Sequence, residues 1–262
     1  MNNMPLVSVF MPIYNQKFFV KEAIESILTQ DYENIEIVAC DDGSTDGTQE
    51  ILKEYHDKYP NKFVLQLSKK NQGITKNCNI CLAACKGKYI AFFAGDDLML
   101  SGKIRKQVEY MEKHPNCTIC YHNLESFDSD TGKTLSHFNN KNNSHQGDVR
   151  LLIKYGMFNG GLSNMVRREQ IPINGYDDRV PIASDWLFFM EILINGGEIN
   201  YINEVLGKYR IHNENTVSTK VLACYLDHFK SSIIIIKKYP RFFIYVLFRY
   251  FNALKNIFFH NF

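Results

Sequence analysis

Apolar segments of two kinds alternate along the first half of the chain. Short runs of β-branched and aromatic residues end in polar clusters, whereas longer segments repeat their apolar residues every three or four positions. The predicted strands are residues 6–11, 35–40, 63–67, 89–93 and 118–121. The predicted helices are residues 17–29, 47–59, 75–85 and 101–114. This alternation predicts an α/β fold with a mostly parallel sheet and helices on both faces.

The strand at residues 89–93 is apolar without alternation, which is typical of a strand buried on both faces. It is followed directly by Ala94, Gly95, Asp96 and Asp97. Two adjacent carboxylates at the carboxyl end of a buried strand suit a divalent cation with oxygen ligands. A solvated turn is the alternative, because Asp and Gly are ordinary turn residues.

Polar residues also follow the first two predicted strands, at residues 12–15 and 41–44. The carboxyl ends of parallel strands meet at one edge of a sheet, and ligands of such folds bind there. We therefore expect these two segments and Asp96-Asp97 to line one ligand site.

The second half of the chain is less regular. Residues 128–147 are polar and aperiodic, which predicts a long loop or hairpin. A helix is predicted at residues 184–193, with Asp185 in its first turn, where the helix dipole alone would also favour a carboxylate. A strand is predicted at residues 199–209, followed by Arg210-Ile211-His212.

Two amphipathic helices are predicted at residues 217–236 and 241–259, hinged at Pro240. The second carries one apolar face and one polar face. The apolar face comprises Ile244, Leu247, Phe251, Leu254 and Phe258, and the polar face comprises Arg249, Asn252, Lys255 and Asn256. Unpaired polar residues argue against a membrane span, and the two faces suit a helix that lies on an anionic membrane surface. Packing on its own domain or on a second copy is the alternative.

The composition is that of an ordinary globular protein. The formal net charge is +2 and charged residues make up 22% of the 262 residues, which gives no indication of a nucleic-acid partner. No signal-peptide pattern opens the chain, so we expect a cytoplasmic protein with reduced thiols. Cys78-x-x-Cys81 and Cys117-x-x-Cys120 have zinc-site spacing, but their positions favour buried thiols over a structural zinc.

Four motifs together resemble glycosyltransferase family 2, the inverting type with the GT-A fold. They are VSVFMPIYN at residues 7–15, DDGSTDGT at 41–48, NQG at 71–73 and AGDD at 94–97, and the similarity extends over residues 5–218. The resemblance implies a Rossmann-like nucleotide-binding sheet in residues 1–122 and an acceptor-binding half in residues 123–215. Residues 216–262 then form a C-terminal helical appendage.

The resemblance also implies residue roles. Asp97 and Asp96 would bind Mn²⁺ or Mg²⁺, which neutralises the leaving diphosphate, and Asp185 would be the catalytic base. The nucleotide-sugar donor, most simply a UDP-sugar, would contact Pro12, Tyr14, Asn15, Asp42, Asn71, Gly73, Asp96, Arg210 and His212. Two positions depart from the family pattern: Ala94 stands where an Asp is common, and Ser184 where a Glu is common.

The implied function is transfer of a sugar to a hydroxyl of a glycan or lipid-linked glycan. This chemistry belongs to the synthesis of envelope polysaccharide, lipopolysaccharide or capsule, at the inner face of the cell membrane. A nucleotidyltransferase is one alternative, although residues 12–17 lack the glycine-rich loop usual in that class. A non-catalytic binding protein is the other, suggested by Ala94 and the amphipathic C-terminal helices.

Overall fold

The computed structural model describes residues 4–139, 144–213 and 219–259, with side chains described up to residue 251. The strands are β1 (Val7–Ile13), β2 (Ile35–Asp41), β3 (Phe63–Leu67), β4 (Tyr89–Phe92), β5 (Leu98–Met99), β6 (Cys117–Asp128), β7 (Thr134–His137), β8 (Met165–Arg167) and β9 (Glu198–Ile211). The helices are α1 (Val20–Leu28), α2 (Thr48–Lys58), α3 (Ile74–Ala84), α4 (Lys103–Lys113), α5 (Val149–Tyr155), α6 (Asp185–Leu193), α8 (Val221–Lys238) and α9 (Phe243–Phe259).

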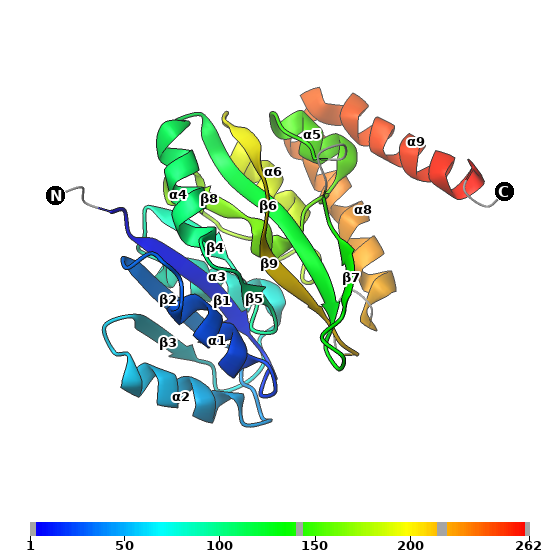
Figure 1. Cartoon of the computed structure of the whole chain (residues 1–262). Helices are drawn as coiled ribbons and strands as arrows, with labels where there is room; N and C mark the ends of the chain where they lie inside the picture. Colours follow the sequence, from blue (N-terminus) through cyan, green and yellow to red (C-terminus); the bar gives the residue numbers. More distant parts are fainter. Residues whose placement is uncertain (1–3, 140–143, 214–218, 260–262) are drawn as a thin grey trace.

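All the described strands belong to one sheet, in the order β3-β2-β1-β4-β8-β6-β9-β5, with β7 paired to β6 (Figure 1). The pairs β1–β2, β2–β3, β1–β4 and β6–β9 are parallel. The short strand β8 is antiparallel to both β4 and β6 and joins the N-terminal strands to the β6–β9 pair. The predicted α/β class and mostly parallel sheet are confirmed.

The sheet separates two apolar cores. Along β1, Val7, Val9 and Met11 enter the core that α1, α2 and α4 cover, and Phe10 enters the opposite core. Helices α3, α5, α6 and α8 pack in that second core. Because helices cover both faces, β4 is buried along its whole length, as the unbroken apolar run predicted.

The largest difference from prediction is in the second half of the sheet. β6 extends to Asp128, although only residues 118–121 were predicted as strand. His122, Asn123 and Ser126 interrupt its apolar pattern, yet they are buried because β6 pairs along its length with β9. The polar segment 128–147 contains strand β7, which forms a hairpin with β6.

The two C-terminal helices pack on the domain beside α5 and α6 (Figure 1). Arg249, on the polar face of the second helix, packs on the domain: its guanidinium lies 4.2 Å from the ring centroid of Trp186. Ile244, Leu247 and Phe251 face outward instead. The side chains of Asn252, Leu254, Lys255, Asn256 and Phe258 lie outside the described residues. No helix in the described ranges is long and apolar enough to cross a bilayer.

Candidate donor and acceptor site

The loops after β1 and β2 are joined by hydrogen bonds at the carboxyl edge of the sheet. The Asn15 amide donates to Ser44 Oγ at 2.7 Å, and the Thr45 amide donates to Asn15 Oδ1 at 3.0 Å. Asn15 has φ 51°, a left-handed conformation that Asn tolerates better than most residues. The predicted convergence of these two strand ends is therefore present. Pro12 is partly buried, and Tyr14 next to it is 44% exposed, so its ring is open for stacking.

Two buried aspartates organise the second loop. Asp41 Oδ1 accepts from the amides of Gly43 and Ser44 and from Gln49 Nε2. Asp42 accepts from the Gln72 amide at 2.8 Å and the Gly73 amide at 2.9 Å, one on each carboxylate oxygen. Asp42 thus connects the β2 loop to the β3 loop, and each oxygen keeps a lone pair for a ligand.

The β2 and β3 loops approach closely at Gly43. Its φ is +75°, and a Cβ there would lie 2.6 Å from the backbone carbon of Lys70. A side chain at this position would push the two loops apart. Beside this contact, Asn71 Oδ1 accepts from the Gly73 amide at 3.0 Å, and Asn71 is exposed.

The acidic pair lies at the end of the strand next to β1. Asp97 is 2% exposed, and burial together with the neighbouring Asp96 raises its pKa well above the usual range. Its Oδ1 accepts from the Arg210 amide at 2.9 Å. Asp96 Oδ2 lies 3.0 Å from His212 Nε2. The structure thus brings Asp96, Asp97, Arg210 and His212 together, although about 115 residues separate the two pairs in sequence.

Arg210 contacts Asp96 and three residues to which the sequence assigned no role in the site, Phe19, Glu22 and Phe127. Its Nε donates to the Asp96 carbonyl at 2.7 Å, and one terminal nitrogen pairs with Glu22 at 2.5 Å. The guanidinium carbon lies 5.1 Å from the Phe19 ring centroid and 4.7 Å from that of Phe127. These contacts fix a cation beside two carboxylates, where it compensates part of their charge.

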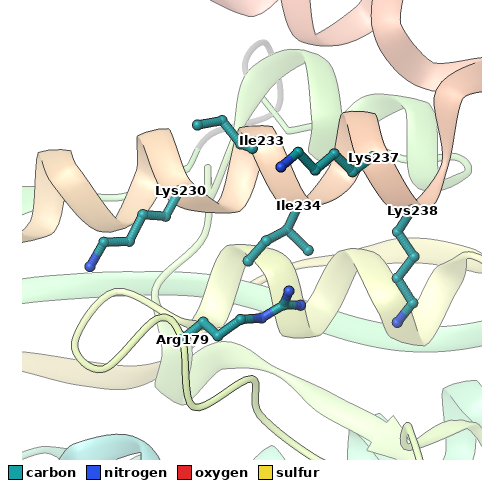
Figure 2. A pocket seen from close by; sticks show the side chains of 6 residues that line it. All are labelled: Arg179, Lys230, Ile233, Ile234, Lys237 and Lys238. Carbon is teal, nitrogen blue, oxygen red and sulfur yellow. The ribbon is translucent and has the colours of Figure 1, made fainter.

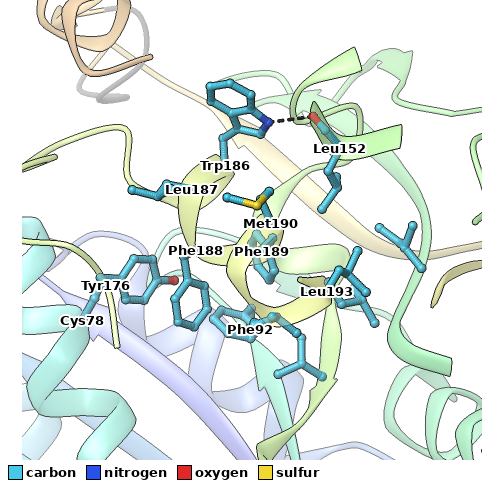
Figure 3. Close-up of a cluster of buried hydrophobic side chains, with 14 of the residues drawn as sticks. Cys78, Phe92, Leu152, Tyr176, Trp186, Leu187, Phe188, Phe189, Met190 and Leu193 are labelled. Atoms are coloured by element: carbon cyan, nitrogen blue, oxygen red, sulfur yellow. Dashed lines mark hydrogen bonds between the residues drawn. The ribbon is translucent and has the colours of Figure 1, made fainter. Parts of the chain in front are cut away.

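Asp185 is the first residue of helix α6 and is exposed to solvent, although many protein atoms lie around its carboxylate. Burial of the carboxylate raises its pKa, and a hydrogen bond from the Tyr176 phenol opposes that rise. The Tyr176 ring stacks on Phe188 at 3.9 Å between centroids (Figure 3). Asn79 donates to and accepts from the Tyr176 backbone, so the phenol is held rigidly toward Asp185.

Helix α3 connects the donor-side loops to the segment that carries Asp185. Thr75 Oγ1 donates to the Val180 carbonyl at 2.8 Å, and Asn77 Nδ2 donates to the Cys40 carbonyl at 2.8 Å. Burial raises the pKa of Cys78, and the carboxylates of Asp185 and Asp42 raise it further. Cys78 therefore lies near enough to Asp185 and Asp42 for both carboxylates to act on its thiol.

The cysteines behave as small apolar side chains. All seven are free thiols and six are buried, including Cys78, Cys81, Cys117 and Cys120. Within the described residues, no group of three or more His, Cys, Asp or Glu side chains is arranged to hold a metal ion. Any metal at Asp96 and Asp97 would thus take much of its coordination from elsewhere, which is usual for Mg²⁺ bound through one or two carboxylates and substrate phosphates.

Comparison with known proteins now decides the family. Residues 8–171 match glycosyl transferase family 2. The chain belongs to this family. An uncharacterized glycosyltransferase of Haemophilus influenzae is 33% identical over 228 residues, which cover 83% of this chain and 69% of that protein. The putative glycosyltransferase EpsE of Bacillus subtilis is 42% identical over 128 residues, 49% of this chain and 46% of EpsE.

Solved structures show the fold of the family. TarS of S. aureus (residues 1–349) matches with a TM-score of 0.72 at 18% identity, over 94% of this chain and 72% of that one. The mannosyltransferase PcManGT of Pyrobaculum calidifontis, in complex with GDP-Man and Mn²⁺, matches with a TM-score of 0.70 at 18% identity, over 90% of this chain and 65% of that one. The chain spans about half the length of several curated relatives that it matches.

Several residues of this family-2 site were missed by sequence reasoning. Asp41 was expected only as part of the polar segment 41–44, and the sequence assigned no role in the site to Phe19, Glu22 or Phe127. Asp41 carries a usable signal, because Asp two and three residues before Gly and Ser is typical of an Asx turn. The others depend on tertiary contacts with Arg210, for which the sequence offers no local pattern.

Proposed function

We propose that this chain is an inverting glycosyltransferase that moves a sugar from a nucleotide-sugar, most simply a UDP-sugar, to a hydroxyl of a glycan or lipid-linked acceptor. The observation that carries the proposal is the set of polar loops at the carboxyl edge of the sheet: Asp42 bonds the β2 and β3 loops together, and Asp96-Asp97 follow β4. Thr75 of α3 bonds the segment just before Asp185. Family membership and the ligands of structurally similar proteins support the proposal. TarS was solved with UDP and with UDP-GlcNAc, and PcManGT with GDP-Man.

The donor-binding roles follow from the geometry of the joined loops. Tyr14 offers an exposed ring on which a base can stack, and Pro12 lies beside it. Asp42 is fixed by the amides of residues 72 and 73, so that its free lone pairs can accept from the imide of uracil. Asn15, Asn71 and Gly73 shape the same loops, and Arg210 and His212 supply positive or hydrogen-bonding groups for a diphosphate.

Asp96 and Asp97 would hold Mn²⁺ or Mg²⁺. The fit rests on the buried Asp97 and its partly buried neighbour Asp96: burial, and then the charge of Asp96, raise the pKa of Asp97, and a divalent cation would relieve this situation. When bound, the metal supplies charge neutralisation for the leaving diphosphate. Ala94, where the family commonly has an Asp, leaves the two carboxylates as the acidic ligands of this segment.

Asp185 would act as the general base. The acceptor hydroxyl attacks the anomeric carbon from the side opposite the diphosphate, the new C–O bond forms as the C–O bond to phosphate breaks, and Asp185 takes the hydroxyl proton. Tyr176 holds the carboxylate, and Gly161 leaves space beside it, because a Cβ there would lie 3.9 Å from Asp185 Oδ2.

The acceptor side and the C-terminal helices complete the proposal. Residues 1–122 form the donor half, residues 123–215 the acceptor half, and residues 216–262 an appendage that contacts an anionic membrane, with a homodimer as the alternative. Similarity to a chondroitin synthase of Escherichia coli and to the minor teichoic acid biosynthesis protein GgaB of Bacillus subtilis supports an acceptor among envelope polysaccharides.

Release of UDP tests the proposal without knowledge of the acceptor. A panel of UDP-sugars is incubated with the protein, with Mn²⁺ and with EDTA, and released UDP is measured over time. We expect slow, Mn²⁺-dependent release from at least one donor, because transferases often hydrolyse their donor. No release and no thermal stabilisation by any UDP- or GDP-sugar would contradict the proposal.

A further inference from the structure

Exposed apolar side chains gather on the two C-terminal helices. Of 20 large apolar residues exposed among the described residues, 12 lie on α8 or α9. On α8 they form a stripe at helical spacing, with exposed fractions of 38–74%: Leu222, Tyr225, Leu226, Phe229 and Ile233. Such a stripe on a surface helix marks an interaction site, because isolated exposed residues would not repeat at this period.

A basic cavity adjoins the stripe. It has a volume of about 410 Å³ and is lined by Arg179, Lys230, Ile233, Ile234, Lys237 and Lys238 (Figure 2). Ile233 belongs to both the stripe and the cavity, so the apolar and basic surfaces are continuous. Arg179, Lys230 and Lys238 pair with Asp177, Asp227 and Glu191, while no acidic partner of Lys237 is found among the described residues.

The charges around the stripe decide between a membrane and a second copy. From residue 219 onward the only acidic residue is Asp227, which is 2% exposed and faces the domain. A two-fold dimer through this face would set the same patch against itself, so its lysines would meet lysines. An anionic lipid surface offers the complementary charge together with an apolar interior for the stripe.

We propose that α8 is the membrane-docking helix: its stripe enters an anionic leaflet, and Lys237 at the adjoining cavity binds lipid headgroup phosphates. This inference rests on the membrane contact included in the proposed function and assigns it to α8 rather than to α9. The described outer face of α9 is apolar, and its Arg249 is turned toward Trp186, so α9 adds apolar area without the basic border.

Co-sedimentation of the full chain with vesicles tests the assignment. Vesicles of phosphatidylcholine alone and of phosphatidylcholine mixed with phosphatidylglycerol are compared at low and high salt. We expect binding to the anionic vesicles that weakens as salt rises. The double variant Leu226→Glu, Phe229→Glu should weaken it more than about tenfold. Lys237→Gln should weaken it by about fivefold at low salt.

The control is Leu135→Glu on β7, which replaces an exposed apolar residue outside α8 and α9 and should bind as the unchanged protein does. Circular dichroism and UDP release without vesicles check that each variant is folded. Absence of vesicle binding by intact protein, or unchanged binding by both α8 variants, would overturn the assignment. A dimer on a sizing column that Phe229→Glu dissociates would instead favour a second copy. Failure of the proposed function would appear separately, as absent donor turnover in a protein that still binds vesicles.

Discussion

The carboxyl edge of the sheet and the outer face of α8 differ in the surroundings of their side chains: protein hydrogen bonds at the first, and solvent at the second. At the sheet edge, Asn15 and Asp42 each accept from a backbone amide 30 residues away in sequence, and Asp41 accepts from amides of its own loop. On α8, large apolar side chains face solvent. The first region has its polar groups fixed by the fold and suits a small polar ligand, whereas the second leaves apolar area in solvent that a covering surface would bury.

The sharpest way to break this comparison is to remove the candidate base and leave the donor loops intact. Asp185→Asn should lower turnover on the true acceptor by ~10²–10⁴, the range typical of a general base. UDP affinity should not change, because the donor contacts lie on the β1, β2 and β3 loops. Steady-state kinetics and calorimetry measure the two effects. Asp178→Asn, at an exposed aspartate of the same region, is the matched control. Near-normal turnover of Asp185→Asn would show that Asp185 is not the base.

The N-terminal half also contains a buried lysine, Lys103, whose charged form destabilises the fold. Lys103 is fully buried at the start of α4, and burial lowers its pKa to about 7 from 10.5. Between about pH 7 and 10.5 the unfolded chain binds more protons than the folded one, so the free energy of unfolding rises with pH. Below about pH 7 Lys103 is charged in both states, and the full cost of burying its ammonium group reduces stability. Lys103→Met should therefore stabilise the protein at pH 7 by on the order of 3 kcal/mol.

Denaturant titrations of both proteins between pH 6 and 10 measure this effect. The unchanged protein should gain stability across the alkaline range, and Lys103→Met should show a flatter profile over the same range. A destabilised Lys103→Met variant at pH 7 would show that the ammonium group is bound by an internal partner instead.

The close approach of the donor loops allows a matched pair of glycine variants. Gly43 and Gly132 have similar positive φ values, +75° and +68°, but a Cβ meets the Lys70 backbone at Gly43 and nothing within 4 Å at Gly132. Both alanine variants carry the same backbone strain, so their difference isolates the contact between loops. We expect Gly43→Ala to cost about 1–3 kcal/mol more in unfolding free energy and to weaken UDP binding. If Gly43→Ala and Gly132→Ala lowered the free energy of unfolding equally, the β2 and β3 loops would not be in close contact at Gly43.

The inner face of α8, unlike its outer face, is hydrogen-bonded to the domain. Asp227 Oδ2 accepts from the Ile182 amide at 2.8 Å and the Ala183 amide at 3.2 Å, just before Asp185. Asp227→Ala should lower turnover about tenfold through misplacement of that segment, with UDP affinity unchanged. Asp227→Asn keeps an acceptor oxygen and should restore most of the rate. If the Ala variant and the unchanged protein had equal kinetics, the contact of Asp227 with this segment would have no role in catalysis.

The fold of the N-terminal half was predicted well because its signals are local. Each strand of that half is a short apolar run with a polar end, and parallel strands bring such ends together without further information. β6 was underestimated because His122 and Asn123 look like the end of a strand, and only pairing with β9 explains their burial. The surroundings of Arg210 depend on Phe19, Glu22 and Phe127, which no local pattern connects.

The C-terminal helices show the limit of helical periodicity. Periodicity correctly predicted amphipathic helices, but it does not state which face meets the domain. In α9, Arg249 of the polar face meets the domain and lies against Trp186, because an aromatic ring can bind a guanidinium on its face. The helix that combines an exposed apolar stripe with lysines is α8.

Metal-dependent binding of UDP tests the central claim most directly. Calorimetric titration of UDP into the protein, with Mn²⁺ and with EDTA, is compared for the unchanged chain and for Asp97→Asn. We expect Mn²⁺ to strengthen UDP binding at least about tenfold in the unchanged chain, and Asp97→Asn to lose this gain while keeping its fold. UDP binding that is equally tight with EDTA, or a full Mn²⁺ effect in Asp97→Asn, would show that Asp97 does not hold a metal for the donor.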